Sequence, residues 1–301
     1  MPLLCSTPPS EQILASFLPG KYIGFPIASY FATRFTYLSK TDWIELILQG
    51  KITVNGTSVL PNYILKEHDY ISANLGFRQE PPANRNLNIL YEDNNIRVFN
   101  KAAPIPVHPS GRFFKNSMTE ILKEKYPDEI PRPVQRLDCS TTGTLVFARN
   151  RKAAAFLMDE FAEQRVLKEY LVIIEGKPMK RYFISDKPIG KIGGTRWGTG
   201  SNIQSSKRAI TYFEWFGSQN GRSLLKAVPQ SGRTNQIRIH LQSEGLPVWN
   251  DPIYGRGQKD PAIEMGLHAY RLKFNCLDRY YDIRAPWPGH FEPFINSGRI
   301  E

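Results

Sequence analysis

Cysteine is scarce in this sequence. The 301 residues contain only Cys5, Cys139 and Cys276, and no two of them form a C-x-x-C pair. This usage argues against a disulfide framework and against a zinc site built from thiolates. We therefore expect the protein to work in a reducing compartment.

Long apolar segments are also missing. No uninterrupted apolar run approaches the roughly 18–20 residues that a membrane-spanning helix needs. The first twenty residues include Pro8, Pro9 and Glu11, with no basic segment ahead of an apolar one, unlike a secretory signal. The sequence predicts a soluble cytoplasmic protein that has no membrane association.

The common cofactor and catalytic signatures are absent. The sequence contains no G-x-x-x-x-G-K-[ST], G-x-G-x-x-G, H-E-x-x-H or G-x-S-x-G motif. None of the five histidines stands at metal-ligand spacing from a carboxylate or thiol. We predict no metal and no cofactor.

What the sequence does have is a globular composition and an excess of positive charge. Hydrophobic residues make up 41% and aromatic residues 12%, which is enough to build a core, and the length predicts about two domains. Lysine and arginine number 39 against 28 acidic residues, a net charge of +11. Such a surplus favours an anionic partner, with nucleic acid the first candidate.

A polar stretch at residues 79–86, which contains Pro81-Pro82, marks a predicted linker because paired prolines interrupt both helices and central strands. We expect an N-terminal extension at 1–25, a small domain at 26–82 and a larger domain at 83–301. Residues 1–82 carry six basic and six acidic side chains, so the positive excess falls in the remainder.

The small domain is predicted to contain two helices followed by a hairpin. An apolar stripe over 27–38 indicates the first helix, and a second is expected between an N-cap at Ser39 and a stop at Gly50. Asn55-Gly56 predicts a tight turn between strands at 52–54 and 57–60, with a last strand near Tyr70-Ile71.

The larger domain reads as strands interrupted by a few helices. Runs rich in β-branched, aromatic and aliphatic residues predict strands, and one amphipathic helix is expected over 152–164. No regular βαβ alternation occurs, so we predict an α+β fold with a mixed or antiparallel sheet. The expected strands span 96–99, 144–148, 170–174, 209–215 and 224–228.

Three segments of the larger domain carry candidate chemistry, and each also has an ordinary structural interpretation. Asp138, ahead of a Ser/Thr/Gly turn, can simply cap that turn. Tyr170 can be a half-buried strand residue. Arg238 can be surface charge on a short helix that Thr234 would cap and Gly245 would end.

A glycine-rich run at 190–200 also contains two cations and a tryptophan. It fits either a loop that closes over a nucleic-acid backbone or the end of a mobile hairpin.

Taken together and in order, these segments resemble the RluA-type pseudouridine synthases. The preceding segment 38–69, with its Asn55-Gly56 turn, resembles the small RNA-binding domain named after a ribosomal protein, the S-four fold, although a mere packing module would show the same pattern. The motifs that carry the RluA-type resemblance are Arg136-Leu137-Asp138, Thr142-Gly143, Lys168-x-Tyr170, Gly232-Arg233-Thr234-x-Gln236-Ile237-Arg238-Ile239-His240, Asp251-Pro252-x-Tyr254-Gly255 and Leu267-His268-Ala269.

The resemblance implies a pseudouridine synthase fold that isomerises uridine within RNA, either ribosomal RNA, most of all that of the large subunit, or tRNA, without a cofactor. Asp138 is then the catalytic residue, which attacks the sugar or the base or removes a sugar proton. Arg238 keeps that carboxylate charged and helps displace the base, and Tyr170 contacts the flipped base. Arg136 and His240 contact phosphate or support the site.

The sequence departs from the family pattern at several positions. Gln135 and Asn235 stand where histidine is usual, Thr142 where serine is common, and Asn250 where glycine is usual. The segment after Lys101 also lacks the familiar Lys-Pro-x-Gly. Two other functions stay open: an RNA-binding protein with an inactive pocket, and an RNA glycosidase or nuclease that uses the same carboxylate. We expect a monomer with no obligate protein partner.

Overall fold

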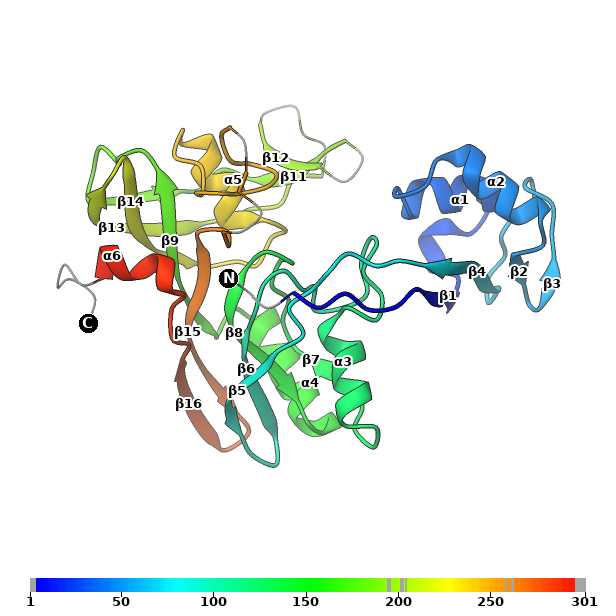
Figure 1. The fold of residues 1–301 in the computed structure, drawn as a ribbon, viewed down its shortest axis with the longest axis horizontal. Coiled ribbons are helices and arrows are strands. Elements are labelled where there is room, and N and C mark those ends of the chain that lie inside the picture. The colour runs from blue at the N-terminus through cyan, green and yellow to red at the C-terminus, as the bar shows by residue number, and fades with distance from the viewer. Residues whose placement is uncertain are drawn as a thin grey trace. The chain divides into compact units, whose positions relative to one another are not determined.

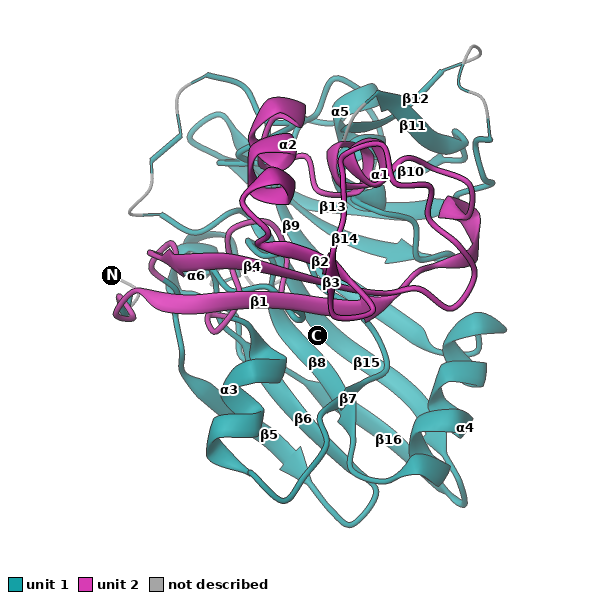
Figure 2. Ribbon diagram, turned by 90° about the vertical axis from the view of Figure 1, so that its right-hand side faces the viewer, with its two compact units in different colours: residues 1–5, 83–108, 117–301 teal, residues 6–82, 109–116 magenta. Residues whose placement is uncertain are grey.

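The computed structural model describes residues 4–193, 196–200, 203, 205–257, 259–260 and 263–295. The described chain forms two compact units (Figure 2). The smaller contains residues 6–82 and 109–116, and the larger contains the described residues of 83–108 and 117–301 together with Leu4 and Cys5.

The smaller unit combines two helices with a four-stranded antiparallel sheet in the order β1-β4-β2-β3. Its core is aromatic, with Phe31 and Trp43 in ring contact at 4.7 Å and both almost fully buried. Its elements are β1 (Ser10–Phe17), η1 (Gly20–Tyr22), α1 (Ile27–Arg34), α2 (Lys40–Leu48), β2 (Ile52–Val54), β3 (Thr57–Ser58) and β4 (Tyr70–Arg78).

Local signals in this unit act as predicted. Ser39 and Asp42 form a reciprocal capping box at the start of α2. Asn55 and Gly56 both have positive φ values, 50° and 79°, as a tight hairpin turn between β2 and β3 requires. The first helix is shorter than its apolar stripe, because it ends at Arg34 and the rest of the stripe packs as a loop.

The predicted division of the chain differs from the observed one in two places. Residues 6–25 of the expected extension are part of the smaller unit, because β1 within this range pairs along β4 in that unit's sheet. Residues 109–116, predicted in the larger domain, belong to the smaller unit. The expected linker at 79–86 does contain a boundary between the units, between Pro82 and Ala83, and Glu80 and Ala83 within it are buried.

The larger unit is a mixed ten-stranded sheet with helices (Figure 1), as the α+β prediction required. The order is β10-β13-β14-β9-β15-β8-β6-β5, with β16 beside β15 and β7 beside β8. All pairings are antiparallel except the short parallel contact of β15 with β8. The strands are β5 (Leu87–Glu92), β6 (Ile96–Lys101), β7 (Arg132–Pro133), β8 (Thr142–Ala148), β9 (Leu167–Glu175), β10 (Tyr182–Ser185), β13 (Thr211–Gln219), β14 (Arg222–Pro229), β15 (Leu267–Cys276) and β16 (Arg279–Arg284).

Helices α4 (Arg151–Ala162) and α5 (Gln236–Ser243) pack on different parts of this sheet. Ala153 and Leu157 of α4 join a core with β6, β8 and β15, whereas Ile237 and Leu241 of α5 join one with β9, β13 and β14. The remaining elements are α3 (Met118–Lys125), η2 (Gly289–Phe291), α6 (Glu292–Ile295) and a separate hairpin of β11 (Ile189–Gly193) and β12 (Arg196–Thr199).

Gly143 permits the parallel contact of β8 with β15. A Cβ atom at this position would lie 2.2 Å from the carbonyl oxygen of Ala269, and the glycine has a φ of 110°. Because any other residue would push the two backbones apart, this glycine fixes where the loop at 138–141 meets the sheet.

Candidate active site

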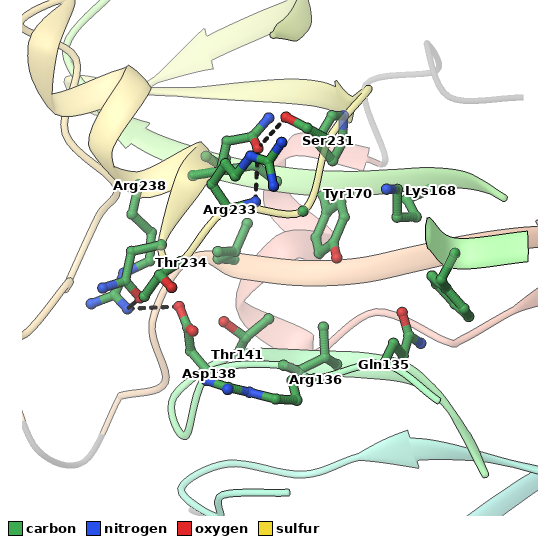
Figure 3. A pocket seen from close by; sticks show the side chains of 18 of the residues that line it. Gln135, Arg136, Asp138, Thr141, Lys168, Tyr170, Ser231, Arg233, Thr234 and Arg238 are labelled. Carbon is green, nitrogen blue, oxygen red and sulfur yellow. Dashed lines mark hydrogen bonds and ion pairs between the residues drawn. The ribbon is translucent and has the colours of Figure 1, made fainter. Parts of the chain in front are cut away.

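A pocket of about 450 Å³ lies in the larger unit, over the part of the sheet between α4 and α5. Strand β9 contributes Lys168 and Tyr170, α5 contributes Arg238, and the loop ahead of β8 contributes Arg136 and Asp138 (Figure 3). Its size is ordinary for a small-molecule or nucleotide site. The structure thus brings four of the five predicted site residues to one cavity.

Asp138 and Arg238 meet directly at one side of the pocket. The Nη1 of Arg238 donates to Oδ2 of Asp138 at 2.7 Å, although the two residues are 100 positions apart in the sequence. The carboxylate is 31% exposed and the guanidinium side chain 4%. The carboxylate is therefore open to the pocket while its partner cation is fixed behind it.

Asp251 holds the guanidinium from the other side. This fully buried carboxylate accepts from Nε of Arg238 at 2.7 Å and from Nη2 at 2.8 Å, a bidentate arrangement. Two backbone N–H groups, from Ile253 and Tyr254, also donate to its Oδ1. Hydrogen bonds to these carboxylates and their charges raise the pKa of Arg238 despite its burial. The arginine is thus always charged.

Asp251 was not among the predicted site residues. The signal that locates it was present, since Asp251-Pro252-x-Tyr254-Gly255 is one of the motifs that carry the resemblance. Nothing in the sequence shows that this carboxylate grips Arg238, which lies on another element.

Tyr170 lies across the pocket from the loop that carries Asp138. Its hydroxyl is directed toward that loop in Figure 3. Burial, and then the charge of Asp138, raise the pKa of Tyr170 above its usual value of 10. The free protein therefore holds this side chain as a neutral phenol, suited to stacking and to hydrogen bonding.

Lys101 supports the loop that presents Asp138, a role that the sequence did not reveal. Its fully buried Nζ donates to the carbonyl oxygens of Ala102, Cys139 and Thr141, at 2.9, 3.2 and 2.7 Å. Burial lowers the pKa of Lys101 to about 8, against the opposing charges around it. The lysine joins the end of β6 to the turn after Asp138 and so fixes that turn.

The two second-rank predictions have different outcomes. Arg136 lines the pocket and is exposed. His240 does not line it: the ring is fully buried, with Nδ1 2.9 Å from Oγ1 of Thr211 and Nε2 3.0 Å from the carbonyl oxygen of Lys187. The buried ring is therefore placed to support the structure and not to contact phosphate in this arrangement.

The departures from the family pattern also find places. Gln135 lines the pocket and donates to the carbonyl oxygen of Thr144. Asn250 and Asn235 both adopt left-handed backbone, with φ values of 56° and 54°, which asparagine tolerates better than most residues. The short helix begins at Gln236 after Asn235, so Thr234 is not its N-cap as predicted.

The described residues also bear on metal binding and on membrane association. Among them, no group of three or more His, Cys, Asp or Glu side chains is placed to bind a metal ion. No described helix is both long enough and apolar enough to cross a membrane.

Comparison with known proteins places this site in a family. The sequence profile of the RNA pseudouridylate synthases matches residues 95–243. An uncharacterized RNA pseudouridine synthase of Bacillus subtilis, YhcT, is 32% identical over 260 residues, which are 82% of this chain and 84% of that protein. The chain belongs to the RNA pseudouridine synthase family.

Other members of this family differ in length. The mitochondrial tRNA pseudouridine(32) synthase of Saccharomyces cerevisiae is 29% identical over 77% of this chain, and mouse pseudouridylate synthase RPUSD2 is 30% identical over 84%. These matches cover 51% and 46% of the two relatives, so the chain spans about half the length of several curated relatives.

Solved structures share the fold. Human RNA pseudouridylate synthase domain containing 1 is 26% identical with a TM-score of 0.60, over 69% of this chain and 86% of the human one. Human RNA pseudouridylate synthase domain containing 4, at 22% identity, has a TM-score of 0.57 over 69% and 92% of the two chains. The predicted pseudouridine synthase fold is confirmed.

Proposed function

We propose that this protein isomerises uridine in RNA to pseudouridine with Asp138 as the catalytic carboxylate. The observation that carries the proposal is the partly exposed Asp138 at the pocket wall, held at 2.7 Å by a buried Arg238. The bond between uracil nitrogen 1 and the ribose is broken, the base turns, and carbon 5 is joined to the sugar. Carbon 5 loses its proton and nitrogen 1 gains one, so the atoms balance.

Each route for this exchange uses an ionised carboxylate. Asp138 attacks the sugar, attacks the base, or removes a sugar proton. The guanidinium of Arg238 favours the charged form of the carboxylate. Tyr170 contacts the flipped uracil as a neutral phenol, and Arg136 at the pocket rim contacts the RNA backbone.

The RNA target and the small unit belong to the same proposal. Two relatives from Saccharomyces cerevisiae are named as tRNA pseudouridine synthases, which supports tRNA beside large-subunit ribosomal RNA as a substrate. The two helices and hairpin of the small unit support an S-four-like role in RNA binding. We also propose a cytoplasmic monomer.

The experiment that tests this function measures tritium release from RNA labelled at uracil carbon 5. Total cellular RNA is the substrate, with the wild type beside Asp138→Asn. Asp159→Asn is the matched control, because Asp159 is an exposed carboxylate on α4 paired with Arg165. We expect release by the wild type and by the control, and none by Asp138→Asn.

Other outcomes favour the two alternatives. Binding of ribosomal RNA and tRNA without release from either supports an inactive pocket. Free uracil or shortened RNA in the reaction indicates a glycosidase or a nuclease. Equal release by Asp138→Asn and the wild type contradicts the role of the carboxylate.

A further inference from the structure

Asn235 precedes α5 in an unusual conformation. Its backbone is left-handed, with φ 54° and ψ 24°, and its side chain makes no capping hydrogen bond to the helix. An asparagine at this position ordinarily accepts from an N–H of the first turn. Here Oδ1 accepts from Nη1 of Arg238 at 2.9 Å, and Nδ2 donates to the hydroxyl of Tyr254 at 3.1 Å.

Tyr254 continues this chain of hydrogen bonds. Its buried hydroxyl donates to the carbonyl oxygen of Trp197 in β12 at 3.1 Å, and its ring lies 5.1 Å from the guanidinium of Arg238. A continuous series of contacts thus runs from Asp138 through Arg238, Asn235 and Tyr254 to the backbone of β12.

The outer end of this series of hydrogen bonds is the hairpin of β11 and β12. It forms its own two-stranded sheet, and its Ile189 and Trp197 pack in a cluster with Tyr254. Lys191 and Arg196 are exposed on the two strands. Exposed cations on a hairpin suit the phosphates of an RNA backbone.

The inner end of the series of hydrogen bonds is Nη1 of Arg238. This nitrogen donates both to Asp138 and to Asn235, while Asp251 takes Nε and Nη2. When Asp138 turns toward a substrate or loses its charge in a covalent step, the amide oxygen of Asn235 keeps an acceptor on the same nitrogen. The guanidinium then stays where the carboxylate needs it.

We propose that Asn235 and Tyr254 are positioning residues that fix Arg238 toward Asp138 and connect this geometry to the β11–β12 hairpin. RNA phosphates on Lys191 and Arg196 would stabilise the hairpin and, through Tyr254 and Asn235, the catalytic pair. This inference rests on the proposed function, because it concerns the rate of the same reaction.

Two substitutions interrupt this series of hydrogen bonds with little other change. Tyr254→Phe removes only the hydroxyl and keeps the ring beside Arg238. Asn235→Gly removes the amide and tolerates the left-handed backbone. Tyr182→Phe is the matched control, because it deletes one hydroxyl hydrogen bond, to Glu214, in the same unit but outside the chain.

The readout is the single-turnover rate of tritium release, measured beside the Kd for RNA. Each variant removes one side-chain link between Arg238 and β12, and it is expected to release tritium about three- to tenfold more slowly, with Kd within about twofold of wild type. The rate of the double variant should lie within about twofold of the rate of the slower single variant. Both substitutions interrupt the same series of hydrogen bonds, so the second adds little to the first. Tyr182→Phe should match the wild type.

Additive effects in the double variant, unchanged rates, or losses confined to Kd would overturn the proposal. A wild type without activity defeats the proposed function instead, and hydrogen exchange then tests the connection itself. Tyr254→Phe should speed exchange both in β12 and in peptides spanning 138–141, where the N–H of Thr141 donates to the carbonyl of Asp138. Unchanged exchange at 138–141 would overturn the connection.

Discussion

At the scale of single residues, the site depends on the shape of one side chain as much as on its charge. Arg238 donates to Asp138, Asn235 and Asp251 at once, and only a planar fork reaches all three. The surrounding carboxylates are arranged so that one is fully buried and the other faces the pocket. An ammonium group of the same charge cannot reproduce this geometry.

Arg238→Lys should therefore impair catalysis although it conserves the charge. Loss of at least one charge-assisted hydrogen bond, worth about 1.5–3 kcal/mol, predicts a fall of roughly 10- to 100-fold in the rate of tritium release. If the lysine variant has the circular dichroism spectrum and the RNA affinity of the wild type, its fold and its binding surface are intact. A lysine variant with the wild-type rate would contradict the requirement for the fork.

Burial also makes one histidine a source of acid sensitivity. His268 is fully buried, with Nδ1 2.8 Å from Oγ1 of Thr142, and burial lowers its pKa to about 4. Between pH 6.5 and 4 the unfolded chain binds a proton at His268 that the folded protein does not. The free energy of unfolding must therefore fall as the pH falls through this window.

His268→Gln should weaken this dependence. One proton corresponds to a slope of about 1.4 kcal/mol per pH unit, so urea titrations at pH 7, 6 and 5 should show a smaller decline in the variant. His290, which is partly buried and whose pKa burial also lowers to about 4, gives the wild type a second such contribution. Parallel declines in wild type and variant would show that His268 does not titrate in this range.

At the scale of elements, the small unit includes a segment from a distant part of the sequence. Glu80, 2% exposed, accepts from the backbone N–H groups of Phe114, Lys115 and Asn116 at 2.7, 2.8 and 2.9 Å. The side-chain amide of Asn116 donates to the carbonyl oxygen of Pro81. A residue from the expected linker thus holds residues 109–116 in the small unit.

Glu80→Gln should loosen this segment. A glutamine has one acceptor oxygen instead of two charged ones, so the three N–H groups lose at least one hydrogen bond of about 1.5–3 kcal/mol. Trypsin should cut faster at the exposed Arg112, as followed by mass spectrometry. Glu67→Gln, a substitution at an exposed position in the same unit, is the control, and trypsin should cut this variant at the wild-type rate.

These elements show what the sequence can and cannot predict. The capping box at Ser39 and the turn at Asn55-Gly56 depend on neighbouring residues, and both were predicted. Lys101 and Glu80 act on backbone groups 34 to 40 positions away, and no local pattern records such contacts.

The site residues divide in the same way. The order of the motifs pointed to Asp138 and Arg238, but not to the bidentate hydrogen bond between Asp251 and Arg238. His240 follows Arg238 by two positions, and residues two apart on a helix with 3.6 residues per turn point about 200° apart. Helical periodicity alone therefore argued against placing both side chains in one pocket.

At the scale of the whole molecule, positive charge is shared between the units unevenly. The transfer of Arg112 and Lys115 gives the smaller unit eight basic and six acidic residues, so it is not neutral as the predicted boundaries implied. The larger unit keeps 31 basic and 22 acidic residues. Most of the attraction for RNA should therefore come from the unit that carries the pocket.

This distribution predicts that RNA binding depends strongly on salt. Cations that neutralise phosphates release counterions, so raising salt from about 50 to 200 mM should weaken binding at least about tenfold. A flat titration would contradict an electrostatic interface.

Arg196→Gln should reduce the slope of log K against log salt by about 0.7–0.9 if Arg196 contacts one phosphate. Arg165→Gln, just after α4 and paired with Asp159 and Glu160, should leave the slope unchanged, so the pair of variants locates the contact on the hairpin.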